Sequence, residues 1–240
     1  YPMIDGVVKG CPHHILEPSR LQLIQYSEDF SQGYWIKTRT SISSNEYISP
    51  EGVLNADKLI ENTDNNSHLL YNTLSVSAQD YTSSIFVREN GRKKIRLRFD
   101  NASFLRYADF DLENGIVDSS SNSTASIESY GNGWYRCSIK VTATATTFYN
   151  VVQLLSDSSS LNYQGDGTSG IYIWGAQLEQ GSYATSYIPN YGTSGGVTRS
   201  AETANGSGDA DTFNDSEGVL MAEISALADD GTYRILSISN

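Results

Sequence analysis

Trp134 and Arg136 are the residues of this sequence best suited to bind a sugar. They lie in the segment GNGWYRCSIKV, where an Asn-Gly turn at 132–133 leads into a predicted strand. Alternation along a strand places both on one face, with Tyr135 and Cys137 on the other. An aromatic ring can cover the apolar face of a pyranose while a guanidinium donates hydrogen bonds to its hydroxyls. Burial of Trp134 under a loop is an equal alternative, and the sequence leaves both open.

A second group of candidate ligand residues lies on other predicted strands. In residues 94–99, basic side chains that include Arg96 and Arg98 alternate with apolar ones, so one strand face is basic. In a chain of net charge −12, this face stands out. It is compatible with a solvated face that keeps the strand soluble, or with a polar groove for an acidic or hydroxylated sugar. Tyr107 and Gln153 complete the candidate ligand set.

The sequence offers little for catalysis. A glycosidase needs two carboxylates held across a cleft, whereas the acidic residues here lie mostly in predicted turns. Motifs for a nucleophile elbow, a phosphate loop or a zinc site are lacking. The remaining alternative is a polysaccharide lyase with Tyr107 as a base beside Arg106. We expect no enzymatic activity.

The cysteines and histidines do not indicate a metal site. Cys11, His13 and His14 lie close together, but adjacent histidines rarely converge on one ion and no second cluster follows. Cys137 lies on the apolar face of its predicted strand, so a buried free thiol is the better interpretation than a disulfide with Cys11.

The elements that must position these residues are predicted strands. Residues 171–174, IYIW, form a continuous apolar run bounded by glycines, so both faces of this strand need cover. In a two-sheet sandwich the opposite sheet covers one face, and a loop, another chain or a ligand covers the other. The first strand and its entry turn span 28–38. The other predicted strands and hairpins span 53–60, 67–76, 81–88, 94–99, 104–117, 134–141 and 147–155. We expect 81–88 and 94–99 to pair as a hairpin through Asn90-Gly91, and 118–126 to be a polar loop.

Composition limits the classes of function. The 240 residues suit one large all-β domain or slightly more, and 16 Tyr against 2 Met favour strands. The net charge of −12 argues against nucleic-acid binding, which needs clustered cations. No apolar run of about 18 residues predicts a membrane span. The first residues do not form a signal peptide, and we expect a chain processed or cut from a longer one.

Four segments occur in an order that resembles a known family. They are SRLQLIQYSEDFSQGYWIK, FDLENGIV, GNGWYRCSI, and IYIWGAQLEQGSYATSYIP followed by TRSAE, spread over roughly residues 19–202. The sequence resembles the carbohydrate-binding-module-like jelly rolls of bacteriophage tail and fibre proteins and of some bacterial surface proteins. It departs from the pattern at residues 20–22, Arg-Leu-Gln, where Arg-Thr-Asn is usual.

The resemblance implies a jelly roll whose ligand site lies on the concave sheet face or in the loops at its edge. It also implies a structural calcium near the first and last strands, for which this sequence offers Glu28, Asp29 and Glu179 as oxygen ligands.

We therefore predict an all-β jelly-roll sandwich with an extended N-terminal arm and a partial second β element. The arm spans 1–27, the jelly roll 28–191 and a Gly/Ser/Thr-rich linker 192–212. Residues 213–240 resemble the opening strands of a concanavalin-like lectin or glucanase, with too few strands to close a second sandwich.

The favoured function is that of a non-enzymatic phage tail or fibre protein that contributes to recognition of host-surface glycans. Its partners would then be a glycan or polysaccharide and other tail or fibre subunits, in the virion tail or an extracellular setting, and a homo-oligomer would suit a fibre. The alternative is a carbohydrate-binding module of a secreted polysaccharide-degrading enzyme. A purely structural spacer would bind no glycan.

Overall fold

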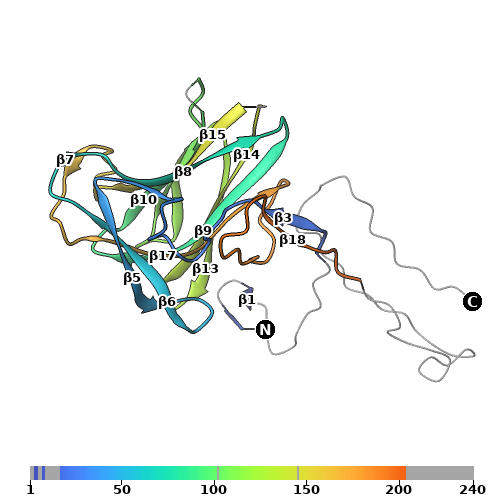
Figure 1. The fold of residues 1–240 in the computed structure, drawn as a ribbon. Coiled ribbons are helices and arrows are strands. Elements are labelled where there is room, and N and C mark those ends of the chain that lie inside the picture. The colour runs from blue at the N-terminus through green and yellow to red at the C-terminus, as the bar shows by residue number, and fades with distance from the viewer. Residues whose placement is uncertain (1–2, 5–6, 9–16, 102, 145, 204–240) are drawn as a thin grey trace, which may run out of the picture.

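Eight strands are divided between two antiparallel sheets in the order of a jelly roll (Figure 1). The structure is a computed structural model that describes residues 3–4, 7–8, 17–101, 103–144 and 146–203. One sheet contains, in spatial order, β6 (Leu54–Glu61), β17 (Gly170–Gln180), β9 (Asp80–Asn90) and β14 (Trp134–Thr142). The other contains β8 (His68–Val76), β15 (Thr146–Leu155), β10 (Lys94–Asp100) and β11 (Tyr107–Asp111). This winding of two sheets confirms the predicted all-β jelly-roll sandwich.

Shorter strands extend the edges of these two sheets. The six-stranded sheet gains β12 (Ile116–Ser121) beside β11 and β4 (Ile36–Thr38) beside β8. The eight-stranded sheet gains β13 (Thr124–Gly131), β5 (Thr40–Ile48), β3 (Arg20–Gln22) and β18 (Val197–Arg199). Two small sheets pair β1 (Met3–Ile4) with β2 (Val7–Val8) and β7 (Asn65–Asn66) with β16 (Tyr163–Gln164).

The core lies between the two sheets because apolar residues occupy every second position of the long strands. On β10, Ile95, Leu97 and Phe99 are buried between the sheets. On β14, Cys137 and Ile139 face them from the other side. Cys137 is a free, fully buried thiol whose pKa is raised by burial, as predicted.

Strand β17 is covered on both faces, as its apolar run predicts. Its inner face packs in the core through Ile171 and Ile173. Its outer face is covered by residues 181–190, which fold back over it so that the ring centres of Trp174 and Tyr187 lie 4.5 Å apart. The strand has a bulge at Gly175, which has φ +61°, and its register with β9 shifts there.

Beyond the bulge, β3 pairs with β17 only at Gln22 and Glu179, and the side chain of Gln22 supplies further hydrogen bonds to the backbone of β17. Gln22 of β3 is fully buried, and its Nε2 donates to the carbonyl oxygen of Ala176 at 2.8 Å. Its Oε1 accepts from the amides of Leu178 at 2.9 Å and Ile24 at 3.0 Å. The edge therefore keeps its hydrogen bonds although the neighbouring strand is short.

Two local predictions are wrong, and one is confirmed in part. The segment 28–38, predicted as a first strand with its entry turn, begins as a turn region and pairs as a strand only at Ile36–Thr38. The expected hairpin of 81–88 with 94–99 does not form, because β9 and β10 belong to different sheets and the Asn90-Gly91 turn carries the chain between them. The expected polar loop 118–126 lies largely in β12 and β13.

The segments predicted as arm and linker each contribute a strand to the edge of the eight-stranded sheet. Strand β3 pairs with β17, and β18 pairs with β3. Glu17 and Arg199 form an ion pair of 2.6 Å that joins the two segments. Residues 204–240, with the predicted concanavalin-like element, and Cys11, His13 and His14 lie outside the described residues. Within the described part of the chain, no helix is long and apolar enough to cross a membrane.

We expect Gly175→Ala to lower the free energy of unfolding by about 1–3 kcal/mol, because an L-residue is strained at this φ. The new methyl carbon would also lie 3.0 Å from a ring carbon of Phe86. Gly33→Ala is the matched control, since a methyl group there meets nothing within 4 Å. Urea unfolding of the two variants measures the difference, and equal stabilities would contradict the assigned strain.

Candidate functional site

The structure divides the predicted ligand residues between opposite faces of the sandwich. Trp134 and Arg136 belong to the outer face of the eight-stranded sheet, where β14 pairs with β9 and β13. Arg96, Tyr107 and Gln153 lie on the outer face of the six-stranded sheet, where Arg96 is in register with Gln153. Arg98 shares that face, in register with Tyr107. The six residues therefore cannot form one site.

Trp134 is buried, and its indole contacts the end of strand β5 rather than a loop. Its side chain is 2% exposed, and its indole Nε1 donates to the carbonyl oxygen of Ile48 at 3.0 Å. It packs in an apolar cluster with Phe86 and Trp174 on the outer face of the eight-stranded sheet. The ring is therefore not available to stack on a sugar in this structure.

The basic row on β10 is neutralised by carboxylates. Arg96 forms two parallel hydrogen bonds with Asp109 of β11, at 2.6 and 2.8 Å. Arg98 pairs with Asp100 at 2.9 Å, and Lys94 contacts Asp118 at 2.6 Å. A face whose cations are paired in this way has little positive charge left for an acidic ligand.

Tyr107 and Arg106 point in different directions and do not form the pair expected of a lyase. The guanidinium of Arg96 lies 3.6 Å from the centre of the Tyr107 ring. Arg106 packs instead against Phe104 and the core residue Phe148. Gln153 is buried, and its amide reaches the carbonyl oxygen of Leu161 at 3.5 Å.

Arg136 lines a groove of about 290 Å³ on the outer face of the eight-stranded sheet, which we call the Arg136 groove. Its floor comes from alternate residues of β13 and β14, and one wall comes from the segment that follows β17. The lining residues are Thr82 of β9, Thr124, Ala125, Ser126 and Glu128 of β13, Arg136, Ser138 and Lys140 of β14, and Ser182, Tyr183 and Ala184. The groove thus combines hydroxyl groups, one tyrosine ring and two cations.

The guanidinium of Arg136 is held in this groove without a counter-charge. It is 5% exposed, its Nη2 donates to Ser84 Oγ at 3.1 Å, and its carbon lies 5.2 Å from the centre of the Phe86 ring. Its Nε is itself buried and has no hydrogen-bond partner among the described residues, which is also true of the Nε atoms of Arg20, Arg88 and Arg199. Lys140, by contrast, forms an ion pair of 2.8 Å with Asp80. Arg136 is therefore the cation of this groove that no carboxylate of the described residues neutralises.

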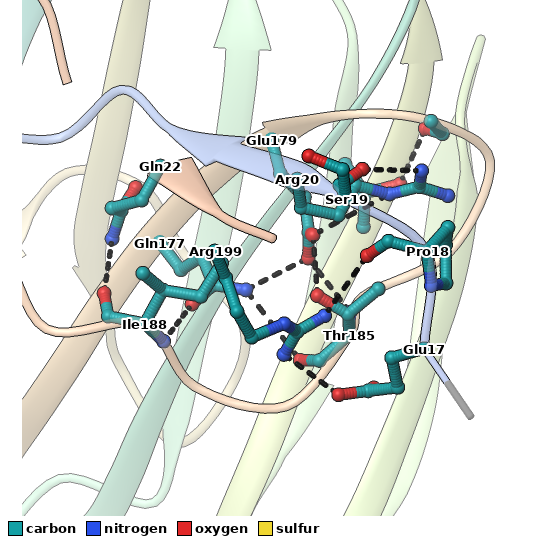
Figure 2. Close-up of polar contacts among 12 residues, drawn as sticks. Glu17, Pro18, Ser19, Arg20, Gln22, Gln177, Glu179, Thr185, Ile188 and Arg199 are labelled. Atoms are coloured by element: carbon teal, nitrogen blue, oxygen red, sulfur yellow. Dashed lines mark hydrogen bonds and ion pairs between the residues drawn. The ribbon is translucent and has the colours of Figure 1, made fainter. Parts of the chain in front are cut away.

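The three carboxylates predicted as calcium ligands are not brought together. Glu179 is fully buried and accepts from the Thr185 amide and hydroxyl, each at 2.7 Å, and from Gln177 Nε2 at 2.8 Å (Figure 2). The Nε of Arg20 lies 3.8 Å from Oε2 of Glu179. Glu179 thereby anchors the segment that covers β17.

Glu28 and Asp29 instead line a different groove, of about 490 Å³, which also contains Asp57. Glu28 accepts from the Tyr187 hydroxyl at 3.0 Å, and burial raises its pKa. Burial acts in the same direction on Asp29, but hydrogen bonds from its neighbours prevail and lower its pKa. In the part of the chain that the structure describes, no group of three or more His, Cys, Asp or Glu side chains is arranged to hold a metal ion.

Sequence reasoning missed most of the groove. Thr124, Ser126 and Glu128 alternate with Ala125 and Ile127, which is a strand pattern hidden inside a serine-rich segment. Tyr183 lies in the segment after β17, where periodicity gives no information about direction. Asp109 and Asp111 also alternate, and their pattern could have revealed the partners of the basic row.

Comparisons with known proteins give similarity of fold only. No protein-family model matches the sequence, and no curated protein matches it. Among solved structures, the chain is similar to TmCBM61 in complex with β-1,4-galactotriose, with a TM-score of 0.43 and 11% identity over 67% of this chain and 99% of that chain.

Two further structures are similar. One contains the CBM22-1 and GH10 modules of the Clostridium thermocellum xylanase 10B with xylohexaose, with a TM-score of 0.40 and 15% identity over 71% of this chain and 30% of that chain. The other is the carbohydrate-binding module CBM6cm-2 of Cellvibrio mixtus lichenase 5A with cellotriose, with a TM-score of 0.36 and 11% identity over 68% and 96%. These scores are low, so the fold assignment rests on the strand order.

We expect Asp109→Ala to lower the free energy of unfolding by about 3–5 kcal/mol, because it leaves the buried Arg96 unpaired. The control is Glu113→Ala, which removes the exposed partner of Lys93 and should cost no more than about 1 kcal/mol. Chemical denaturation distinguishes the two. Similar losses would mean that Arg96 is not held by this pair.

Proposed function

We propose that this chain is a non-catalytic carbohydrate-binding module whose ligand lies in the Arg136 groove. The observation that carries the proposal is the guanidinium-bearing side chain of Arg136, which lines a groove of hydroxyl side chains and forms no ion pair with a carboxylate of the described residues. A cation removed from water without a partner is costly, and a ligand hydroxyl or carboxylate in the groove would pair with it.

The chemistry of the groove suits a sugar better than an apolar ligand. Serine and threonine hydroxyls both donate and accept, so they can match the hydroxyls of a pyranose. Tyr183 supplies an aromatic ring at the wall, and Arg20 lies over this ring at 5.3 Å from its centre. The volume, about 290 Å³, is at the lower end for small-molecule sites, which suits one or a few sugar units.

A binding role without catalysis is consistent with the charged residues of the groove. Among the described lining residues, Glu128 is the single carboxylate, whereas glycoside hydrolysis uses two. The groove has neither a histidine nor a cysteine in its lining.

The setting in which such a module acts stays a prediction. Attachment to a secreted polysaccharide-degrading enzyme and a place in a phage tail or fibre are both compatible with a sugar-binding groove. Both settings imply an extracellular or virion location. Their ligands would differ, since the first would be the substrate polysaccharide and the second a host-surface glycan.

We expect the purified chain to bind a subset of oligosaccharides on a glycan array, and Tyr183→Ala and Thr124→Trp each to weaken this binding by about tenfold or more. The first variant removes the ring at the wall, and the second places a bulky side chain at an exposed lining position.

The matched control is Tyr149→Ala, which removes a half-exposed ring from the outer face of the other sheet. It should bind like the unmodified chain. Lost binding in Tyr149→Ala with normal binding in Tyr183→Ala would move the site to the six-stranded sheet. No binding to any oligosaccharide would contradict the proposed function.

A further inference from the structure

We propose that the ligand of the Arg136 groove carries a carboxylate, so that the groove takes a hexuronate unit of an acidic polysaccharide. This inference rests on the proposed function and concerns the class of sugar that the groove selects.

Carboxylates pair with six of the arginines in the described residues. Arg92 pairs with Glu61 and Arg96 with Asp109, both through short bidentate contacts. The remaining paired arginines are Arg20, Arg39, Arg98 and Arg199. In a chain of net charge −12, a carboxylate partner is thus the usual surrounding of an arginine.

Arg136 departs from this pattern although it is among the more buried arginines. Its neighbours are the neutral Ser84 and Phe86, and no carboxylate of the described residues forms an ion pair with it. Arg88 and Arg106 also lack an ion pair in the described structure, but neither lines the Arg136 groove or the acidic groove beside Glu28. An aromatic ring offsets part of a guanidinium charge, but it supplies no negative charge. The charge that is missing at Arg136 can come from the ligand.

The direction of the side chain indicates where a ligand carboxylate would bind. On β9, Phe86 is in register with Arg136, whereas Ser84 is in register with Ser138, two residues further along β14. Because Arg136 donates to Ser84, its guanidinium leans along the groove toward the hydroxyls and Lys140. A carboxylate at Arg136 would leave the sugar hydroxyls over Ser126 and Ser138.

Glu128 is the carboxylate placed nearest to Arg136 in the strand register, but it does not pair with it. It lies directly opposite Arg136 in the β13–β14 register, on the same face, but it is exposed and forms no ion pair there. Its charge should repel an anionic ligand. Of the two cations in the groove, Lys140 is paired with Asp80, so Arg136 is the one that favours a ligand carboxylate, and Glu128 is an anion whose removal should strengthen binding.

The overall negative charge does not decide the outcome. At about 0.1 M salt, charges separated by more than about 10 Å are largely screened. The nearby and buried guanidinium is screened least, so it dominates the local interaction with a ligand carboxylate.

The test compares matched ligands that differ only at the carboxyl group. Oligosaccharides of galacturonate, glucuronate and mannuronate are titrated against the full chain by calorimetry, each beside its carboxyl-reduced form. We expect at least one uronate to bind about tenfold or more tightly than its reduced form, which is the effect of one charge-assisted hydrogen bond.

Two variants and one competitor sharpen the result. Glu128→Gln should tighten uronate binding severalfold and leave the reduced form unchanged, and it does not disturb a buried contact. Arg136→Gln should make the two forms bind equally. Inorganic phosphate should compete only weakly, and competition equal to that of the uronate would indicate a simple anion site and overturn the inference.

The failures of the two proposals are distinguishable. Equal binding of uronate and reduced forms, still lost in Thr124→Trp, would overturn the carboxylate and leave the sugar-binding groove intact. No binding of either form, together with no binding of any neutral oligosaccharide on the array, would contradict the proposed function. If Arg136→Gln does not fold, the comparison of each uronate with its reduced form, and the effect of Glu128→Gln on uronate binding, still test whether the ligand carries a carboxylate.

Discussion

The structure depends on the burial of β17 on both faces. A strand with apolar residues at successive positions is stable only if the second face is also removed from water. The opposite sheet covers the inner face, and the chain's own residues 181–190 cover the outer one (Figure 1). This cover is held by polar side chains of β17 itself, because Gln177 and Glu179 accept the amides of Ile188 and Thr185 (Figure 2).

The same cover creates the candidate site. Near Trp174, aromatic rings cover the outer face of the sheet, and the indole of Trp134 is buried among them. Toward Arg136 and Lys140, the covering segment contributes only a wall, and the hydroxyl-bearing residues of β13 and β14 remain open as a groove. One face of one sheet is therefore divided into an apolar part that stabilises the fold and a polar part that is free to bind.

Sequence periodicity predicts the strands and the direction of their side chains, but not which strands pair. Alternation in residues 94–99 and 134–141 correctly separates core from outer face, because the period of a strand is fixed by its geometry. A tight turn such as Asn90-Gly91 has the same local signal whether it joins a hairpin or crosses between sheets, so the sequence alone predicts that β9 and β10 pair in one sheet. For the site, Arg136 could be predicted to face outward. The burial of Trp134 could not, since it depends on the carbonyl oxygen of Ile48, far away in sequence.

The central claim, that Arg136 is the group that meets the ligand, is tested most directly by NMR of arginine side chains. The Nε–H signals of the ¹⁵N-labelled chain are followed while a uronate oligosaccharide is added, and the signal of Arg136 is assigned by its loss in Arg136→Lys. We expect this signal to shift to saturation while those of Arg96 and Arg98 stay in place. Shifts of Arg96 or Arg98 with an unchanged Arg136 signal would contradict the account.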